Sequence, residues 1–159
     1  MLKKWIVLFF CLWITNLHAQ QNKEELAIKK VIATFFKGLH QGDSTLMQTT
    51  LHKDIKIQTT SINKEGTSIL KNESRLKLLT SVANKKPEHV YLEKVLAYQI
   101  NVDTNLASVW TPYEFYFNGK FSHCGANSFQ LFKEDNQWKI IFLVDIRRRE
   151  NCKALKEMN

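Results

Sequence analysis

The sequence is poor in cysteine, glycine and proline, with 3, 5 and 2 residues respectively among 159. Three cysteines are too few for a small scaffold that depends on many disulfides. The scarcity of glycine and proline, beside 44% hydrophobic residues, excludes collagen-like, low-complexity and wholly disordered chains. The length and the hydrophobic fraction together predict one globular domain with a substantial core.

Motifs that signal common enzyme chemistries are also missing. The sequence has no glycine-rich phosphate-binding loop and no Gly-x-Ser-x-Gly nucleophile elbow. His40, His52, His89 and His123 lie on separate predicted elements, and no Cys-x-x-Cys pair accompanies them. We therefore expect no metal site and no cofactor.

Basic residues outnumber acidic ones, but they are spread along the sequence rather than gathered in long runs. Lys and Arg number 23 against 15 Asp and Glu, which gives a formal net charge of +8. The basic runs Lys85-Lys86 and Arg147-Arg148-Arg149 are short, as in a solvated loop and a strand end, rather than a nucleic-acid groove. We expect no nucleic-acid partner, although the surplus charge favours anionic ligands or an anionic envelope surface.

The first 19 residues have the pattern of a secretory signal peptide. Lys3 and Lys4 precede an uninterrupted apolar run over residues 5–14, and Ala19 is the small residue before the expected cleavage point. That run is shorter than the roughly 20 residues of a membrane-spanning helix. Cys11 follows Phe10, which does not favour a lipoprotein anchor. We predict export to the periplasm or the medium, with no membrane span.

The rest of the chain divides into a helical part and a strand-rich part. Apolar residues three and four apart predict a helix over 22–41, a short helix to about residue 51 and a third helix over about 68–83. A strand is expected over 54–60. From residue 85 the period is two, which predicts strands over 88–102, 105–117, 120–133 and 137–148. We expect one domain over 20–149 and a C-terminal tail over 150–159.

This order of elements resembles the nuclear transport factor 2-like superfamily, which includes SnoaL-like cyclases, ketosteroid isomerases and lumazine-binding-like proteins. The resemblance rests on the end of the first helix, residues 35–43, on Val109-Trp110-Thr111-Pro112-Tyr113-Glu114-Phe115-Tyr116, on Asn118-Gly119-Lys120 and on Trp138-Lys139-Ile140-Ile141. It implies a cone-shaped α+β fold in which three N-terminal helices pack on a curved, mostly antiparallel sheet. It also implies a pocket between helices and sheet, often in a dimer, but no particular function. The catalytic carboxylate patterns of the isomerases and cyclases are not matched.

The hairpin at Asn118-Gly119 allows a prediction of which residues face one another. A two-residue turn places Glu114 opposite His123, and His123 then lies beside Arg148 on the last strand. A carboxylate raises the pKa of a neighbouring imidazole and orients it, as an acid/base pair requires. Rows of opposite charge also stabilise sheets without catalysis. Both interpretations of Glu114 and His123 stay open, and a β-bulge would change the register.

The same register assigns the more apolar face of the sheet to the pocket. That face carries Leu106, Trp110, Phe129, Leu131, Ile140, Phe142, Val144 and Ile146. Pockets for small molecules are typically apolar and aromatic with a few polar groups. The candidate ligand-binding residues are Trp110, Tyr116, Phe121, Asn127, Phe129 and Arg148. Alternatively, the aromatic side chains simply fill the core.

The opposite face is too apolar for a solvated sheet. It carries Val109, Tyr113, Phe115, Phe117, Phe132, Ile141 and Leu143. Exposed apolar surfaces of this kind usually mark interfaces, so we predict a homodimer packed sheet to sheet. The alternative is that the C-terminal tail or long loops cover this face.

Two cysteines, Cys124 and Cys152, remain after the N-terminal segment. An oxidising compartment favours a disulfide between them, which would tie the C-terminal tail to a strand. The alternative is two free thiols.

Three functions follow as hypotheses. The first is an exported domain that binds a small, partly apolar molecule without chemical change. The second is an isomerase, cyclase or dehydratase that uses His123 with Glu114 as acid and base and Tyr116 as a hydrogen-bond donor. The third is a protein-interaction module that acts through the outer sheet face.

Overall fold

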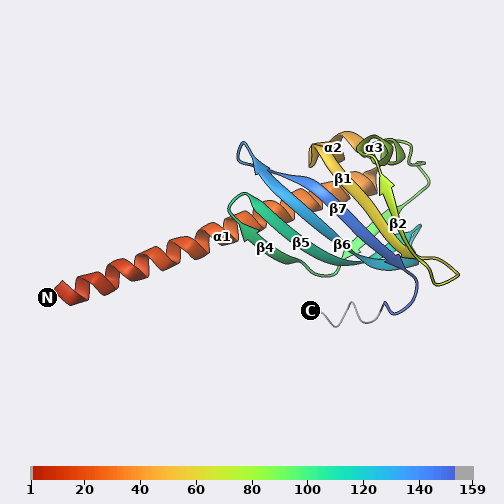
Figure 1. The fold of residues 1–159 in the computed structure, drawn as a ribbon. Helices are drawn as coiled ribbons and strands as arrows, with labels where there is room; N and C mark the ends of the chain where they lie inside the picture. Colours follow the sequence, from red (N-terminus) through yellow and green to blue (C-terminus); the bar gives the residue numbers. More distant parts are fainter. Residues whose placement is uncertain (1, 153–159) are drawn as a thin grey trace.

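The computed structural model describes residues 2–152, with side chains described from residue 20 onward. The elements are α1 (Leu2–Gln41), α2 (Ser44–Gln48), β1 (Leu51–Ile62), β2 (Ser68–Glu73), α3 (Arg75–Ala83), β3 (Tyr91–Val95), β4 (Gln99–Asp103), β5 (Leu106–Phe117), β6 (Lys120–Glu134) and β7 (Gln137–Arg148). The seven strands form one sheet in the order β2-β1-β7-β6-β5-β3, and β4 also pairs with β5 (Figure 1). β1 and β7 are parallel, and the other neighbours are antiparallel. The predicted α+β class and helix-on-sheet architecture are confirmed.

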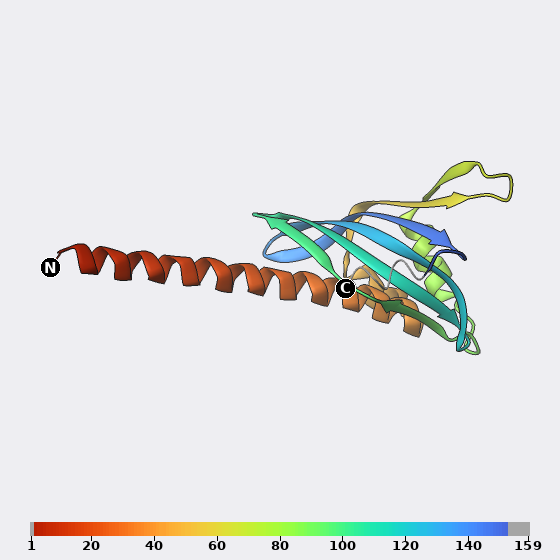
Figure 2. The ribbon, with the colours of Figure 1, turned by 90° about the horizontal axis from the view of Figure 1, so that it is seen from below.

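The second half of α1 packs against one face of the sheet, called here the inner face (Figure 2). The apolar stripe predicted over residues 22–41 is responsible, because Ile28 and Ile32 are fully buried and Phe35 and Phe36 nearly so. Gly42 follows the helix at φ 71°, a conformation that glycine adopts without steric cost. The helix is longer than expected, since it runs from Leu2 without a break before residue 22. Among the described residues, no helix is long and apolar enough to cross a membrane.

The predicted third helix over 68–83 is wrong in its first half. Residues 68–73 form β2, which pairs with β1, and only Arg75–Ala83 is helical. Ser74 explains the boundary, because its Oγ accepts a 3.1 Å hydrogen bond from the Lys77 N–H and so caps the helix. The predicted strand over 88–102 is likewise two strands, β3 and β4, which pair with successive parts of β5.

Two β-bulges change the predicted register. The hairpin pairs Phe117 with Lys120 and Tyr116 with Phe121 as expected, but the next pair is Phe115 with His123. One extra residue in β6 therefore shifts every later pair, and Glu114 lies opposite Cys124. The prediction that Glu114 faces His123 is wrong, and the two side chains lie on opposite faces because successive strand residues alternate.

The second bulge lies in β7. Leu131 pairs with Ile140 as predicted, but Gln130 then pairs with Phe142, and Phe129 with Leu143 instead of Phe142. Arg148 consequently lies beside Cys124 rather than His123. A shift of one residue moves all subsequent side chains to the other face.

The assignment of faces is corrected accordingly. Phe129, Leu131 and Ile140 belong to the buried core as predicted, together with Val109 and Leu143, which were assigned to the exposed side. Leu106 and Trp110, by contrast, were assigned to the pocket but are 50% and 38% exposed. The face originally proposed for dimer contacts is therefore largely the inner face, which packs against the helices.

Glu24 fastens α1 to the hairpin between β6 and β7. Its Oε1 accepts a 2.7 Å hydrogen bond from Lys133 Nζ, and its Oε2 accepts a 2.8 Å bond from Trp138 Nε1. These two bonds, led by that from Lys133, lower the pKa of the Glu24 carboxyl. The contact sets the position of α1 over the inner face, and hence the space between them.

Candidate functional site

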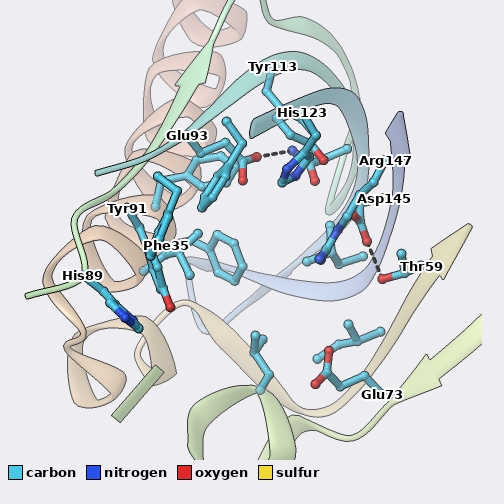
Figure 3. Close-up of a pocket in the computed structure, with 18 residues that line it drawn as sticks. Phe35, Thr59, Glu73, His89, Tyr91, Glu93, Tyr113, His123, Asp145 and Arg147 are labelled. Carbon is cyan, nitrogen blue, oxygen red and sulfur yellow. Dashed lines mark hydrogen bonds and ion pairs between the residues drawn. The ribbon is translucent and has the colours of Figure 1, made fainter. Parts of the chain in front are cut away.

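A cavity of about 440 Å³ lies between the helices and the inner face of the sheet (Figure 3). α1 and α3 contribute one side, and β1, β2, β3, β5, β6, β7 and the segment before β3 contribute the rest. The apolar lining consists of Phe35, Phe36, Leu39, Ile57, Leu78, Tyr91, Tyr113, Phe115, Phe117 and Leu143. The polar lining consists of Thr59, Glu73, His89, Glu93, His123, Asn127, Asp145 and Arg147.

One wall of the cavity is aromatic. Tyr91 on β3 lies 5.8 Å, between ring centroids, from both Phe115 and Phe117 on β5. Phe115 stacks on His123 at 4.8 Å, and Phe117 meets the edge of His89 at 5.0 Å. We call these five residues the aromatic wall. Their rings lie side by side because odd-numbered residues of β3 and β5 share the inner face.

Glu93 and Asn127 form the polar centre. Asn127 is 5% exposed, and its Nδ2 donates a 2.7 Å hydrogen bond to Glu93 Oε1. Burial away from water raises the pKa of the Glu93 carboxyl to about 7, against the opposing effect of the Asn127 bond. The carboxyl therefore changes its protonation state near neutral pH, which is unusual for a glutamate.

A second polar group lies across the cavity on β7. Asp145 accepts a 2.6 Å hydrogen bond from Thr59 Oγ1 and a 2.7 Å bond from Arg147 Nε (Figure 3). Arg147 is thus already neutralised by a carboxylate within its own strand. The pair lies across the cavity from Tyr91 and His89, and His123 lies on the same side as Arg147.

His123 lines the cavity, but without the expected carboxylate at its side. Its Nδ1 lies 3.1 Å from Ser122 Oγ, and its ring is held between Phe115 and Tyr113. Burial, followed by the positive charge of Arg147, lowers the pKa of His123. The prediction of a raised imidazole pKa is therefore wrong, because Glu114 is on the far face and a cation is nearby.

Tyr113 lines the cavity and is 1% exposed. A Cβ on Gly125, its cross-strand partner, would approach the Tyr113 hydroxyl to 2.8 Å and collide with the Ile146 carbonyl oxygen. Only glycine leaves this space. Burial raises the pKa of the Tyr113 phenol, which stays neutral.

Of the sequence-predicted site residues, His123 and Asn127 line the cavity. Phe129 is fully buried beneath it, with its ring 5.9 Å from Phe35 and 6.1 Å from Phe36. The other candidates are not among the lining residues: these are Trp110, Glu114, Tyr116, Phe121 and Arg148. They sit beyond the bulges or on even positions of β5, so they fall on the other face, here called the outer face.

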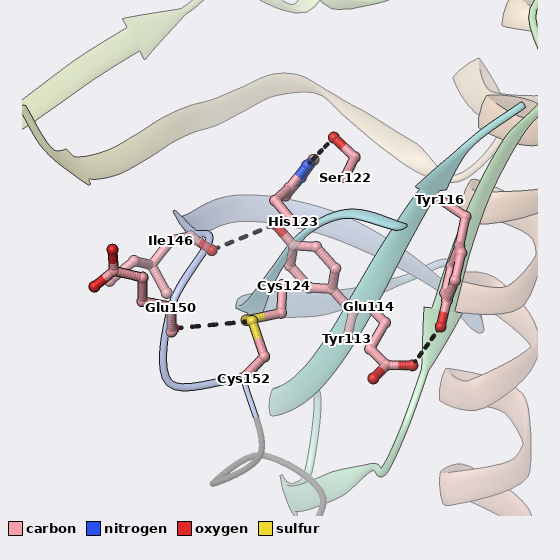
Figure 4. The surroundings of a disulfide bond; sticks show 9 residues. All are labelled: Tyr113, Glu114, Tyr116, Ser122, His123, Cys124, Ile146, Glu150 and Cys152. Atoms are coloured by element: carbon pink, nitrogen blue, oxygen red, sulfur yellow. Dashed lines mark hydrogen bonds between the residues drawn. A yellow bond between two sulfur atoms is a disulfide. The ribbon is translucent and has the colours of Figure 1, made fainter. Parts of the chain in front are cut away.

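Glu114 and Tyr116 interact with one another there. The Tyr116 hydroxyl donates a 2.9 Å hydrogen bond to Glu114 Oε2 (Figure 4). Cys124, the cross-strand partner of Glu114, is fully buried and bonded to Cys152 as a disulfide. The favoured pairing of the two cysteines is therefore present, and it fixes residue 152 to β6 on the outer face.

Four lining residues were not predicted from the sequence: Glu93, Tyr91, Asp145 and Arg147. On β7, the alternation of Leu143, Asp145 and Arg147 indicates that these residues share one face. Because the bulge in β7 was not recognised, they were assigned to the wrong face. Glu93 alternates with Tyr91 and Val95 in the same way. Among the residues that the structure describes, no group of three or more His, Cys, Asp and Glu could hold a metal ion.

Comparison with solved structures places this architecture among nuclear transport factor 2-like proteins. A protein of unknown function from Mycobacterium tuberculosis has a TM-score of 0.66 at 16% identity, over 84% of this chain and 76% of the other. A nuclear transport factor 2-like protein of unknown function from Shewanella baltica has a TM-score of 0.57 at 16% identity, over 80% and 96%. A "putative scytalone dehydratase" from Novosphingobium aromaticivorans has a TM-score of 0.61 at 12% identity, over 80% and 86%. These identities establish the fold alone.

The family is more specific than the fold. Residues 23–143 match the model of the family described as "Putative lumazine-binding", and the chain belongs to that family. No match to a curated protein is found. The resemblance inferred from the sequence is thereby confirmed.

Proposed function

We propose that the protein binds a small, flat, partly apolar molecule in the cavity between α1 and the inner face of the sheet, without chemical change to it. One observation carries the proposal: a cavity of about 440 Å³ with ten apolar and eight polar lining residues. That size and that mixture are typical of small-molecule sites. The family description names lumazine, whose flat bicyclic ring has the shape that the aromatic wall favours.

Native mass spectrometry of the purified protein tests this proposal, with a variant that fills the cavity. Leu78 lines the cavity, whereas Leu76 on the same helix is 74% exposed. We expect retained ligand mass, or added lumazine, on the wild type and on Leu76→Trp, but not on Leu78→Trp. Equal binding by Leu78→Trp and Leu76→Trp would contradict a ligand in this cavity.

Acid/base catalysis is a second candidate, supported by the raised pKa of Glu93, about 7, inside the cavity. A carboxyl with that pKa can both accept and donate a proton at neutral pH. Glu93 then replaces Glu114 in the enzyme hypothesis, with neutral His123 nearby. Incubation of the recovered ligand with wild type and Glu93→Gln distinguishes the two functions: turnover lost in the variant with binding retained supports catalysis, and no turnover by wild type supports binding alone.

We further propose that the protein is exported and loses residues 1–19. The positive residues, the apolar run and Ala19 support this proposal. The intact mass of the protein from the exported fraction tests it, since cleavage after Ala19 leaves a chain that starts at Gln20. A mass that includes Lys3 and Lys4 would contradict it.

A homodimer through the outer face is also proposed, on residues that differ from those first expected. Leu106 and Trp110 on β5 are 50% and 38% exposed there, and Phe142 and Val144 are partly exposed on β7, which β6 separates from β5. Light scattering tests this proposal. We expect wild type and the remote variant Glu134→Gln to be dimers, and Trp110→Glu to be a monomer. A monomeric wild type would contradict it, and capture of a different protein through Trp110 would favour the interaction-module hypothesis.

A further inference from the structure

We propose that the molecule held in the cavity carries a positively charged or protonatable nitrogen on its flat ring, which lies against the aromatic wall and beside the Glu93 carboxyl. This inference rests on the proposed binding function and specifies the chemical class of the ligand. It runs against the expectation from overall charge, because a chain with a formal net charge of +8 would be expected to favour anions.

The charged groups that line the cavity are mostly acidic. Three carboxyl groups line it, those of Glu73, Glu93 and Asp145, against one guanidinium, that of Arg147. Arg147 is already paired with Asp145 at 2.7 Å. Among the described residues, neither Glu73 nor Glu93 forms an ion pair with a lysine or arginine. The basic surplus of the chain therefore lies outside the cavity, whose interior is acidic.

The aromatic wall favours a cationic ligand. Aromatic rings are negative on their faces, so a cation above a ring is attracted, most strongly where water is excluded. Tyr91 already attracts one cation, since Lys85 Nζ lies 5.6 Å from its ring centroid. Lys85 is not among the lining residues, and its Nζ donates a 2.8 Å hydrogen bond to the His89 carbonyl oxygen, so it stays at the rim. Among the described residues, no lysine or arginine lies over the rings of Phe115 and Phe117, although His123 stacks on one face of Phe115.

The raised pKa of the buried Glu93 carboxyl also favours a cationic ligand. The Glu93 carboxyl interacts with Asn127 on β6, with Asp145 and Arg147 on β7 and with Tyr113 on β5. His40 on α1 accepts a hydrogen bond from the Glu93 backbone N–H, and His123 on β6 lines the same cavity. Burial raises the pKa of Glu93 to about 7, and the charge of Asp145 adds to the increase. A ligand cation within about 4–6 Å would favour the ionised carboxylate instead. A cationic ligand would therefore displace the Glu93 proton, while a neutral ligand would leave it bound.

An anionic ligand fits less well. Its one cationic partner in the lining, Arg147, is engaged by Asp145, and the side chain of Arg147 is 57% exposed at the edge of the site. An anion deeper in the cavity would approach Glu93 and the negative faces of the rings. Like charges at such distances are unfavourable, and more so where water is excluded.

Isothermal titration calorimetry with three probes of similar shape tests the inference: 1-methylquinolinium, which is permanently cationic, 1-methyl-2-quinolone, which is neutral, and naphthalene-1-sulfonate, which is anionic. Titrations at pH 7 in two buffers of different ionisation enthalpy give the number of protons released. We expect the cation to bind at least about tenfold more tightly than the neutral probe. We also expect it to release about half a proton, since Glu93 is half protonated near its pKa.

Variants identify the groups responsible. Glu93→Gln keeps an acceptor for the Asn127 amide but cannot ionise, so proton release and the cation preference should both disappear. Phe115→Leu keeps the carboxyl and removes one ring, so the preference should weaken while proton release persists. Glu134→Gln, at the exposed last residue of β6, is the matched control for a lost carboxylate and should behave as wild type.

The outcomes separate this inference from the proposed function. Tighter binding of the quinolone or the sulfonate, lost in Leu78→Trp, would overturn the cation preference and leave the cavity as a binding site. A cation preference that survives in Glu93→Gln would also overturn the role given to Glu93. Failure of all three probes to bind, or binding unchanged in Leu78→Trp, would overturn both proposals.

Discussion

Asn127 on β6 donates a 2.7 Å hydrogen bond to Glu93 on β3, and this bond joins two strands that β5 separates. The pair lies in the middle of the cavity, where Asn127 is 5% exposed. A buried carboxylate without a cation is costly, which is why the proton stays on Glu93 up to about pH 7. The ionised carboxylate is therefore destabilising in the folded protein, and a buried group of this kind points to a role in ligand binding.

The first prediction concerns Glu93 and pH. Because its pKa rises from 4.5 to about 7 on folding, the folded state holds the proton more tightly than the unfolded state. This contribution to stability is full below pH 4.5 and is lost as pH rises through 7. Glu93→Gln should therefore be more stable than wild type at pH 8, by roughly 1–3 kcal/mol. Chemical denaturation at pH 5 and pH 8 measures this, and a stability difference that does not change with pH would contradict it.

The second prediction concerns the attachment of α1. Glu24→Gln weakens the bond to Lys133 and should lower the free energy of unfolding by about 1–2 kcal/mol at pH 7. The folded pKa of Glu24 is depressed below 4.5, so the contribution is present above that pH and is lost as pH falls through the folded value. Glu25→Gln, one residue away and without these partners, is the control. Identical urea midpoints for the two variants at pH 7 would count against this account.

The third prediction concerns the free edge of β3. The Glu93 N–H donates a 2.8 Å hydrogen bond to His40 Nε2, which satisfies an edge-strand donor. His40→Ala should cost about 1–3 kcal/mol, because it leaves a partly buried N–H unpaired. Burial lowers the His40 pKa from 6.5, so its contribution is present above pH 6.5 and is lost as pH falls towards the folded value.

Hydrogen exchange of the Glu93 amide measures this contact directly. Exchange should accelerate in His40→Ala and stay slow in Lys30→Ala, an exposed substitution on the same helix. Unchanged protection of the Glu93 amide in His40→Ala would show that the imidazole is not its acceptor.

The fourth prediction concerns the disulfide. Cys124 and Cys152 are 28 positions apart, and closing a loop of that length contributes roughly 3–4 kcal/mol in the chain-entropy model. Cys152→Ser should lose stability of that order, and reduced wild type should match the variant. If Cys152→Ser unfolds at the same temperature as oxidised wild type, the disulfide contributes nothing to stability.

The fold was predictable because its signals are local. The stripe of Ile28, Ile32 and Phe35 specifies the helix, and Asn118-Gly119, at φ 49° and 75°, specifies the hairpin turn. Period-two alternation located β5, β6 and β7 to within a residue or two.

The site was only partly predictable because it depends on irregularities that alternation does not reveal. A single extra residue near Ser122 in β6 reversed the predicted face of β5, and one near Ile141 reversed the predicted face of the rest of β7. They brought Asp145 and Arg147 into the cavity and left Trp110 and Glu114 outside it. His123 and Asn127 were identified correctly as lining residues, although His123 was given the wrong carboxylate partner.

The central claim is that the inner face of the sheet, and not the outer face, holds the ligand. Chemical-shift mapping by NMR with 1-methylquinolinium tests it most directly, because both faces are read in one spectrum. The account predicts shifts at inner-face positions such as Phe115, His123 and Asn127, with the outer-face indole of Trp110 and the amide of Ser128 unmoved. Shifts concentrated at Trp110 and Ser128, with Asn127 unchanged, would contradict it.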